Sequence, residues 1–420
     1  MIASVKGTRD LLPPETRVWN RVEAIAREAF ALYGFDEIRT PVLESTELFV
    51  RSVGESTDIV HKEMYTFTDR GGRSVTLRPE NTAGVARAYV EHALAQAGRP
   101  WKLYYVGPQF RYERPQKGRY REFRQIGAEI LGPADAATDA ELLVMLFDFL
   151  GKLGFAGLSV SLNSVGTETE RPEFIQALRA WFSSKENLLD EDDRRRLAEN
   201  PLRILDSKNP RLAEWLADPS LPRMVDYLSK DSSEHHTMLL GFLDAARIPY
   251  RIDPLLVRGL DYYTRTVFEV TAAGLGAQDA ILGGGRYDRL VSDLGGPKTA
   301  GIGFAIGADR LVSILPEAFR SAAIGAVRPV ALIPLERPDM EDALSLAREL
   351  REAGIPVDLV TAAKGPGHGL KVAEKTGASL ALLLGRKERD AGVVNVKDLA
   401  RRTQESLPRL GLAAALRARL

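Results

Sequence analysis

The feature that most constrains the fold is a stretch rich in aromatic and β-branched residues, interrupted by a short basic loop. It runs from Leu103 to Leu131 and reads LYYVGPQFRYERPQKGRYREFRQIGAEIL. Its two ends have the composition of strands, while its middle carries the proline, glycine and charge of a connection. The sequence therefore predicts two strands joined as a long hairpin.

This hairpin concentrates positive charge. Between Gln109 and Arg124, six cations stand against two anions, in a chain of 420 residues whose net charge is zero. If the second strand is extended, its period of two places Arg121, Gln125 and Glu129 on one sheet surface. A buried amide or carboxylate costs ~1–3 kcal/mol unless it is paired, so a bound ligand is the expected partner. A solvated hairpin tip is the alternative, and it is the ordinary explanation of a charged run.

The residues FRYERPQKGRYREFRQ, from 110 to 125, resemble motif 2 of the class II aminoacyl-tRNA synthetases, in the form found in the histidyl-tRNA synthetase family. The resemblance implies an α/β protein whose α+β catalytic domain has an antiparallel sheet flanked by helices. It also implies histidine, ATP with Mg²⁺ on its phosphates, and a histidine tRNA as substrates.

Composition excludes several other classes of protein. The chain has no cysteine, so it has neither disulfides nor a thiolate zinc site, and its five histidines show no ligand spacing. We expect no zinc and no structural metal. No run of about 18 apolar residues occurs and the first residues lack a signal pattern, so we expect no membrane segment and a cytoplasmic location. Because the net charge is zero, a nucleic acid must be met by local basic patches such as the hairpin.

The N-terminal region predicts a helix followed by an unusual strand. Residues 15 to 33 place apolar side chains at helical spacing, and the pattern stops at Gly34. Pro41 then interrupts a strand-like run, which suits an edge or interface strand. The order of helix, strand and proline resembles motif 1, which builds the dimer interface of class II enzymes. The resemblance therefore implies a homodimer, and a plain edge strand is the alternative.

From Ser74 the chain reads as a short strand, a turn and a helix capped by Asn81 or Thr82, which places Glu80 at the corner. A carboxylate there can simply complement the helix dipole, which is worth ~0.3–1 kcal/mol. By resemblance to the histidyl family, Glu80 and Thr82 face the α-amino group of the substrate.

The run RGLDYYT, which begins at Arg258, resembles a signature special to histidyl-tRNA synthetases. Gly259 lets backbone or ligand approach closely, and the guanidinium of Arg258 can hold a phosphate bidentately. Asp261, Tyr262 and Tyr263 offer an acceptor and two hydroxyls to an imidazole. A surface cation and a pair of core tyrosines are the ordinary alternatives.

Two glycine-rich runs follow. GGGRYDRLVSDLGG, from 283 to 296, reads as a glycine turn opening a helix and lacks the spacing of a P-loop or a dinucleotide fingerprint. In the resembling family Tyr287 lines the histidine pocket. GIGFAIGADRLVSIL, from 301 to 315, reads as a strand running into a helix that begins near Asp309. It resembles motif 3, whose arginine, here Arg310, contacts the γ-phosphate of ATP.

The chain divides into four predicted parts. Residues 1–166 and 249–323 form the catalytic domain, and residues 167–248, which read as helices broken by proline and asparagine, form a helical insertion. In the family such an insertion folds over the bound tRNA; a mere embellishment is the alternative. After a loose join at 321–329, residues 327–420 alternate strands and helices, as in a parallel-rich α/β domain, and resemble the anticodon-binding domain of class II enzymes. Five arginines near the C-terminus fit phosphate contacts or a solvated helix face: Arg401, Arg402, Arg409, Arg417 and Arg419.

The resemblance implies formation of histidyl-adenylate and transfer of the histidyl group to the 3′ end of a tRNA. In that reaction Arg111 and Arg258 hold the α-phosphate and serve catalysis, while Arg119 and Arg310 hold the distal phosphates. The acceptor end of the tRNA lies near the 109–124 hairpin, and the anticodon lies at the C-terminal domain. The residues that bind histidine are Glu80, Thr82, Gln125, Glu129, Arg258, Tyr262, Tyr263 and Tyr287.

Two other functions remain open. The first is the synthetase-like, histidine-binding regulatory subunit of ATP phosphoribosyltransferase, which generally lacks the C-terminal domain and the catalytic arginines, although this chain has both. The second is a class II enzyme for another amino acid, which the run RGLDYYT disfavours.

Overall fold

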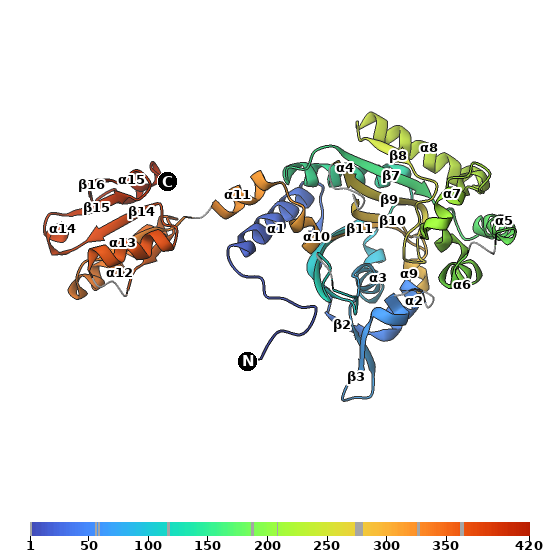
Figure 1. The fold of residues 1–420 in the computed structure, drawn as a ribbon, viewed down its shortest axis with the longest axis horizontal. Helices are drawn as coiled ribbons and strands as arrows, with labels where there is room; N and C mark the ends of the chain where they lie inside the picture. Colours follow the sequence, from blue (N-terminus) through green and yellow to red (C-terminus); the bar gives the residue numbers. More distant parts are fainter. Residues whose placement is uncertain are drawn as a thin grey trace. The chain divides into compact units, whose positions relative to one another are not determined.

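The computed structural model describes residues 2–54, 57, 59–115, 118–185, 189–207, 209–273, 280–325, 328–361 and 365–420. The chain forms two compact units, residues 1–320 and 321–420 (Figure 1). In the first unit the predicted hairpin consists of β5 (Trp101–Phe110) paired antiparallel with β6 (Glu122–Gly132), so that prediction is confirmed. Lys117, one of the six hairpin cations, lies outside the described residues.

An eight-stranded sheet forms the centre of the first unit. The order across the sheet is β1 (Asp36–Glu37), β5, β6, β11 (Ala300–Gly307), β10 (Ala280–Arg286), β9 (Thr264–Ala272), β7 (Leu158–Ser164) and β8 (Tyr250–Ile252). The six inner strands pair antiparallel, and the edge strands β1 and β8 pair parallel with their neighbours. This is the antiparallel-rich sheet that the motif 2 resemblance implies.

Helices cover both faces of this sheet. On one face the ring of Phe30 lies 5.5 Å from the ring of Tyr104 and 6.0 Å from that of Phe304. On the other face Tyr105 belongs to a buried cluster with Tyr89, because neighbouring residues of a strand point to opposite faces. The first face carries α1 (Glu15–Leu32), α4 (Ala136–Lys152) and α8 (Lys230–Ala245), and the second carries α3 (Thr82–Glu91) and α9 (Leu290–Asp293).

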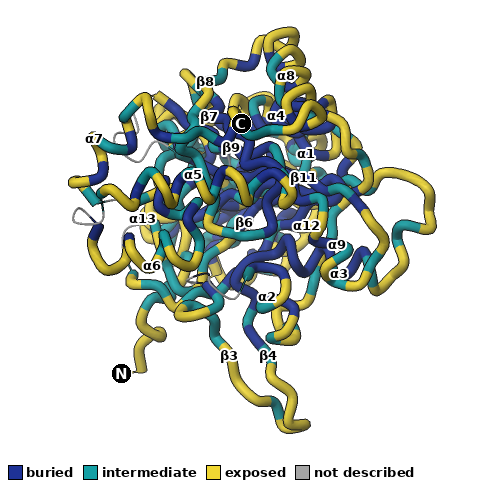
Figure 2. Tube along the Cα trace, turned by 90° about the vertical axis from the view of Figure 1, so that its right-hand side faces the viewer, coloured by how far each residue is buried: buried dark blue, intermediate teal, exposed yellow. Residues whose placement is uncertain are grey.

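A three-stranded sheet adjoins the second face. Its order is β2 (Leu43–Ser45), β4 (Ser74–Leu77) and β3 (Tyr65–Thr68), and near it lie α2 (Thr46–Val53) and the π-helix η1 (Ile59–Glu63). The 3₁₀ helix η2 (Leu94–Ala97) follows α3 and packs with it on the large sheet. Figure 2 shows the β3–β4 hairpin projecting from a buried centre. Pro41 lies between β1 and β2, so the single interrupted strand of the sequence analysis is two short strands, at the edges of different sheets.

The glycines from Gly283 to Gly285 lie inside β10, so the prediction of a glycine turn is wrong. A Cβ on Gly283 would overlap the guanidinium of Arg258, which packs across the strand there. The glycine leaves room for this side chain within a strand and does not mark a turn. The predicted helix after it is only the four residues of α9.

Between β7 and β8 the described chain is helical, as predicted. Segments up to Leu228 share a buried cluster of their own that includes Phe174 and Phe182. In contrast, α8 packs on α4, where His235 contacts Asp139. The insertion predicted at residues 167–248 therefore includes α8, although this helix belongs to the layer that covers the large sheet. The elements are α5 (Arg171–Ser183), α6 (Glu191–Glu199), η4 (Pro201–Asp206), η5 (Pro210–Leu212), α7 (Ala213–Leu216), η6 (Met224–Tyr227) and α8.

After β11, α10 (Ala308–Ser313) begins close to Asp309, as predicted, and α11 (Glu317–Gly325) follows. The loose join predicted at 321–329 is therefore helical through Gly325, while residues 326–327 lie outside the described part. Within the described ranges no helix is long and apolar enough to cross a membrane.

The second unit has a five-stranded sheet between two apolar clusters. Its order is β13 (Val357–Leu359), β12 (Val330–Pro334), β14 (Leu380–Leu384), β15 (Val393–Asp398) and β16 (Thr403–Pro408). Only β13, β12 and β14 are parallel, so the sheet is more mixed than the sequence predicts. Its helices are η7 (Arg337–Asp339), α12 (Met340–Glu352), α13 (Pro366–Lys375), α14 (Arg386–Asp390) and α15 (Leu412–Arg417).

Several of the C-terminal arginines have partners within this unit. Arg409 is ion-paired with Asp342 and Glu349, and Arg419 is ion-paired with Glu405. Arg401 lies 3.9 Å from Asp398, and Arg417 donates to the carbonyl oxygen of Ala353. The contacts of Arg409, Arg417 and Arg419 hold the C-terminal end of the chain to α12 and to the β15–β16 hairpin, while that of Arg401 lies within the hairpin.

Candidate functional site

The four arginines expected to hold ATP line one pocket of about 330 Å³. Arg111 directly follows β5, and Arg119 lies in the connection to β6. Arg258 precedes β9, and Arg310 lies in the first turns of α10. Residues far apart in the chain thus meet because the antiparallel order of the sheet places β6, β11, β10 and β9 side by side.

Three carboxylates also line this pocket. Glu269 is ion-paired with Arg258, and Glu113 lies 3.9 Å from Arg111 and 3.7 Å from Arg119. These pairs are partly exposed, so each contributes at most about 1 kcal/mol to stability. The third carboxylate, Asp309, accepts hydrogen bonds from Arg9 outside the pocket and from the amide of Arg124. The charge of Asp309 is therefore partly balanced by Arg9, which belongs to none of the predicted motifs.

Two buried polar atoms near these arginines have no hydrogen-bond partner within the described part of the chain. They are Oε1 of Gln125 and Nε of Arg258. A buried polar atom without a partner costs ~1–3 kcal/mol. Both residues line the pocket, so a bound ligand is the natural source of the missing hydrogen bonds.

Glu129 is the centre of a second, buried group. Thr82 Oγ1 donates to Glu129 Oε1 at 2.7 Å, Tyr105 donates its hydroxyl to the same oxygen at 3.3 Å, and Tyr287 donates to Oε2 at 2.5 Å. Burial raises the pKa of Glu129 to about 8, against the opposing effect of these donors. A carboxyl group poised in this way ionises when a cation or an N–H donor is placed beside it.

Glu80 lies at the strand-to-helix corner, as predicted. Its carboxylate accepts from the backbone N–H groups of Thr82 at 2.7 Å and Ala83 at 3.0 Å. It therefore caps α3, which is the ordinary explanation considered above. Burial raises the pKa of Glu80, with the helix N–H groups and the charge of Arg111 acting in the opposite direction. Through Thr82 the cap is joined to the Glu129 group.

The three tyrosines of the expected histidine pocket pack together. The ring of Tyr262 lies 4.7 Å from that of Tyr263 and 5.7 Å from that of Tyr287, and all three belong to one buried cluster with Tyr105. Burial raises the pKa of each of the three hydroxyls. The three tyrosines thus pack as core residues, which is the ordinary alternative, and they also lie close enough to Glu129 for its charge to act on their hydroxyls.

Arg121 does not join the site, although strand period groups it with Gln125 and Glu129. It precedes β6, so the alternation of side chains does not extend to it. Its guanidinium lies 3.7 Å from the ring centre of Tyr112 and donates to the carbonyl oxygen of Glu113. Arg121 therefore stabilises the connection between β5 and β6.

Three residues of this region were not predicted as site residues: Tyr105, Gln109 and Gly303. Gly303 lies opposite Glu129 in the β6–β11 register, and a Cβ there would overlap the carboxylate. Tyr105 and Gln109 share a face of β5, and the amide of the fully buried Gln109 has no partner among the described residues. For these two residues the alternation of side chains along the first strand of the hairpin is a signal that the sequence contains.

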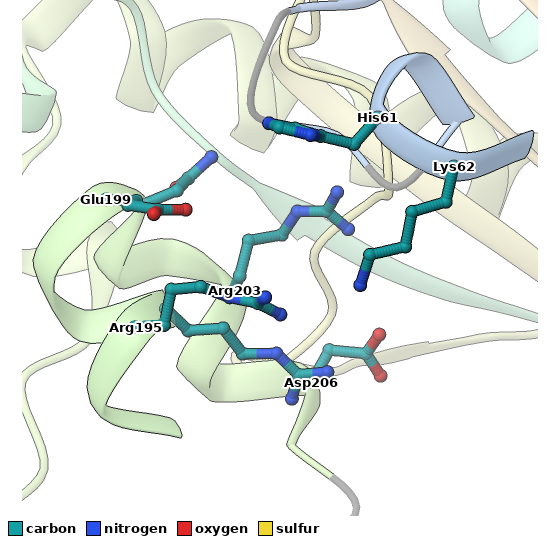
Figure 3. A pocket seen from close by; sticks show the side chains of 8 residues that line it. His61, Lys62, Arg195, Glu199, Arg203 and Asp206 are labelled. Atoms are coloured by element: carbon teal, nitrogen blue, oxygen red, sulfur yellow. The ribbon is translucent and has the colours of Figure 1, made fainter. Parts of the chain in front are cut away.

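A separate cationic pocket of about 160 Å³ lies between η1 and the helical insertion (Figure 3). His61 and Lys62 come from η1, while Arg195 and Arg203 come from α6 and η4. The remaining described lining residues are Arg196, Glu199, Asn200 and Asp206. The carbonyl oxygen of Glu63, at the end of η1, accepts from the backbone N–H of Tyr112 at 2.7 Å, so η1 is joined to the hairpin connection.

No group of three or more histidine or acidic side chains that could hold a metal ion occurs in the described ranges. The carboxylates of the arginine pocket are nevertheless oxygen donors of the type that Mg²⁺ takes in company with phosphate oxygens. The residues therefore fit a magnesium ion that arrives with a nucleotide.

Comparison with known proteins agrees with this geometry. Residues 7–311 match the family model described as histidyl-tRNA synthetase, and residues 329–419 match an anticodon binding domain. A curated histidine-tRNA ligase of Koribacter versatilis is 47% identical over 99% of this chain and 96% of its own length. A second, from Solidesulfovibrio magneticus, is 46% identical over 100% of this chain and 98% of its own.

Solved structures give the same result. The apo histidyl-tRNA synthetase of S. aureus has a TM-score of 0.82, is 34% identical, and is aligned over 99% of both chains. A structure from Bacillus halodurans, described as an ATP phosphoribosyltransferase regulatory subunit/histidyl-tRNA synthetase, is 23% identical with a TM-score of 0.66 and shares the fold. The family model covers well over half of the chain, and the curated relatives match it along nearly its whole length. The resemblance seen in the hairpin is confirmed, and the chain belongs to the histidyl-tRNA synthetase family.

Proposed function

We propose that this chain is a histidine-tRNA ligase, which forms histidyl-adenylate from histidine and ATP and transfers the histidyl group to the 3′ end of histidine tRNA. The observation that carries the proposal is the meeting of four arginines in one pocket beside a buried carboxyl group. Gln125 lines that pocket, and Glu129 projects from the same face of β6 four residues later, roughly 13 Å away. A nucleotide and an amino acid can therefore lie end to end along one strand.

The arginines suit adenylate formation because this reaction depends on cations placed around developing negative charge. Arg111 and Arg258 hold the α-phosphate, and Arg119 and Arg310 hold the β- and γ-phosphates. Glu113 and Glu269 are the carboxylates that would help to hold a magnesium ion arriving with ATP. When bound, the ion adds Lewis-acid stabilisation of phosphate charge.

The histidine lies over the second group of residues. Glu80 and Thr82 face its α-amino group, and Gln125, Glu129, Tyr262, Tyr263 and Tyr287 complete the pocket with Arg258. Support comes from the raised pKa of Glu129, since a cationic amine or a ring N–H favours the ionised carboxylate. Support also comes from the unpaired amide oxygen of Gln125.

The tRNA places its acceptor end near the 109–124 hairpin and its anticodon at residues 327–420, and the enzyme acts as a cytoplasmic homodimer. The match of residues 329–419 to an anticodon binding domain supports the second contact. It also disfavours the regulatory-subunit alternative, as does the presence of all four arginines at the pocket.

The test is charging of tRNA by the purified chain. With ATP, Mg²⁺ and histidine tRNA, radiolabelled histidine becomes acid-precipitable, and omission of ATP abolishes the signal. A chain that binds histidine tightly but never charges tRNA would be a histidine sensor, and the proposal would be wrong.

A further inference from the structure

The segment that carries Arg258 and Tyr263 has little regular structure of its own. Residues 253–263, here called the signature loop, join β8 to β9 without forming helix or strand. Its apolar side chains divide between two cores: Leu255 packs on the cluster of the helical insertion, while Leu256 packs on the cluster beneath the histidine site. The signature loop therefore lies at the interface between the helical insertion and the core beside the large sheet.

Side chains from outside the loop satisfy several of its polar groups. Asn163 of β7 donates to the carbonyl oxygens of residues 254 and 256 at 3.2 and 3.0 Å. Three further donors come from the helical insertion. Arg171 donates to the carbonyl oxygen of Tyr263, Arg203 donates to that of Gly259 at 3.1 Å, and Asn200 donates its Nδ2 to Asp261 Oδ1 at 2.9 Å. The helical insertion thus donates hydrogen bonds to the signature loop at Gly259, Asp261 and Tyr263.

Asn200 and Arg203 have a special place in this arrangement. Both line the cationic pocket between η1 and the insertion, and both line a smaller cavity of about 140 Å³ whose other walls include Arg258, Asp261 and Tyr263. They therefore separate the cationic pocket from the smaller cavity beside the signature loop. In Figure 3 Arg203 lies between the insertion helices and η1.

We propose that Asn200 and Arg203 are positioning residues for histidine activation. Neither of them is among the residues that line the arginine pocket. By holding Asp261 and Gly259 from behind, they fix the path of the loop, and so the direction in which Arg258 and Tyr263 enter the site. The helical insertion then contributes to the first step of the reaction, before any tRNA is bound. The proposal rests on the proposed function, because it concerns the adenylate-forming step.

A misplaced guanidinium loses much of its effect, since a shift of about 1 Å in a reacting group can cost roughly 10²-fold in rate. Asn200 and Asp261 are both partly exposed, which reduces the value of their hydrogen bond. We therefore expect Asn200→Ala to lower the maximum rate of histidine-dependent pyrophosphate exchange roughly tenfold, a loss that one hydrogen bond to a charged group can account for. The KM for histidine should change little, because orientation of Arg258 acts in the transition state.

The experiment measures pyrophosphate exchange without tRNA, normalised to active sites by the burst of adenylate formation. Arg195→Ala is the matched control, since Arg195 lines the same outer pocket but is bonded to Asp192 of its own helix. It should exchange pyrophosphate as the parent does. Arg203→Met, which keeps an unbranched side chain and removes the donor to Gly259, should lose severalfold and serves if Asn200→Ala does not fold.

A partner exchange separates positioning from general damage. Asn200→Asp alone removes the donor and sets two carboxylates side by side, so its exchange rate should fall at least as far as that of Asn200→Ala. Combining it with Asp261→Asn restores one donor and one acceptor, and should return most of the parent's rate. Parent-like rates for Asn200→Ala and Arg203→Met, or a double variant no better than Asn200→Asp, would overturn the proposal. Failure of the parent itself to exchange pyrophosphate with histidine would instead refute the proposed function.

Discussion

Replacing Arg258 with alanine is the sharpest single perturbation of the site. Its guanidinium lines the arginine pocket, packs against Gly283 and is ion-paired with Glu269. We expect Arg258 to act mainly in the transition state of adenylate formation, where charge builds on the α-phosphate. The alanine variant should therefore lose maximum rate rather than affinity for histidine.

The size of the loss follows from the setting of the side chain. Two unit charges about 4 Å apart interact by ~4 kcal/mol at an effective dielectric constant near 20. The Arg258 side chain is 26% exposed and Glu269 offsets part of its charge, which reduces the available stabilisation to about 3–4 kcal/mol. That range corresponds to a fall of roughly 10²–10³ in rate.

The assay is histidine-dependent pyrophosphate exchange with varied histidine. Arg258→Ala should lower the maximum rate by this factor with little change in the KM for histidine. Arg258→Lys should restore only part of the rate, because an ammonium cannot hold two oxygens in a plane. Adding Glu269→Gln to Arg258→Ala should also restore part of it, since the alanine variant leaves a carboxylate facing the phosphates. Transfer from preformed histidyl-adenylate to tRNA should suffer less than activation.

A folded, dimeric Arg258→Ala enzyme that activates histidine within threefold of the parent would refute this reasoning. Arg258 would then be the surface cation that its sequence context also allows.

Three further predictions concern pH, domains and assembly. Because Glu129 is protonated below its pKa of about 8, the KM for histidine should fall by up to tenfold per pH unit as the pH rises towards 8 and level off above it. The Glu129→Gln variant should lack this pH dependence. Identical pH profiles for parent and variant would contradict a role for Glu129 in binding histidine. Deleting residues 326–420 should leave pyrophosphate exchange measurable and severely weaken tRNA charging, so normal charging by a folded, dimeric truncated enzyme would count against the division of labour. Sedimentation at micromolar concentration should give about twice 46.2 kDa, and a stable monomer would exclude the predicted homodimer.

Local patterns in the sequence predicted much of the fold. The apolar spacing of α1 and the composition of the β5–β6 hairpin both gave elements close to their actual bounds. Periodicity failed where the cause lies in tertiary packing. Gly283 reads as part of a turn, yet it pairs in a strand between β9 and β11, and the guanidinium of Arg258 packs where its side chain would be. Likewise, α8 has an ordinary helical pattern, and nothing in that pattern says which core it packs on.

The site was predictable where a motif names a side chain and less so where partners come from distant segments. The four arginines that the motifs name line one pocket and Glu129 lies in the buried group with Thr82, while their roles stay predictions. Arg121 falls outside because it precedes the start of β6, so strand alternation does not extend to it. Asn200 and Arg203 belong to no motif. Their contacts with the signature loop appear only once the insertion is folded against it.

The most direct test of the whole account is pyrophosphate exchange by the purified chain with each of the twenty amino acids in turn. The arrangement of Gln125, Glu129 and the three tyrosines beside the arginine pocket predicts exchange that depends on ATP, Mg²⁺ and histidine, and background rates with the other nineteen. Exchange driven by another amino acid, or no exchange with histidine by a folded and active-site-competent preparation, would contradict it.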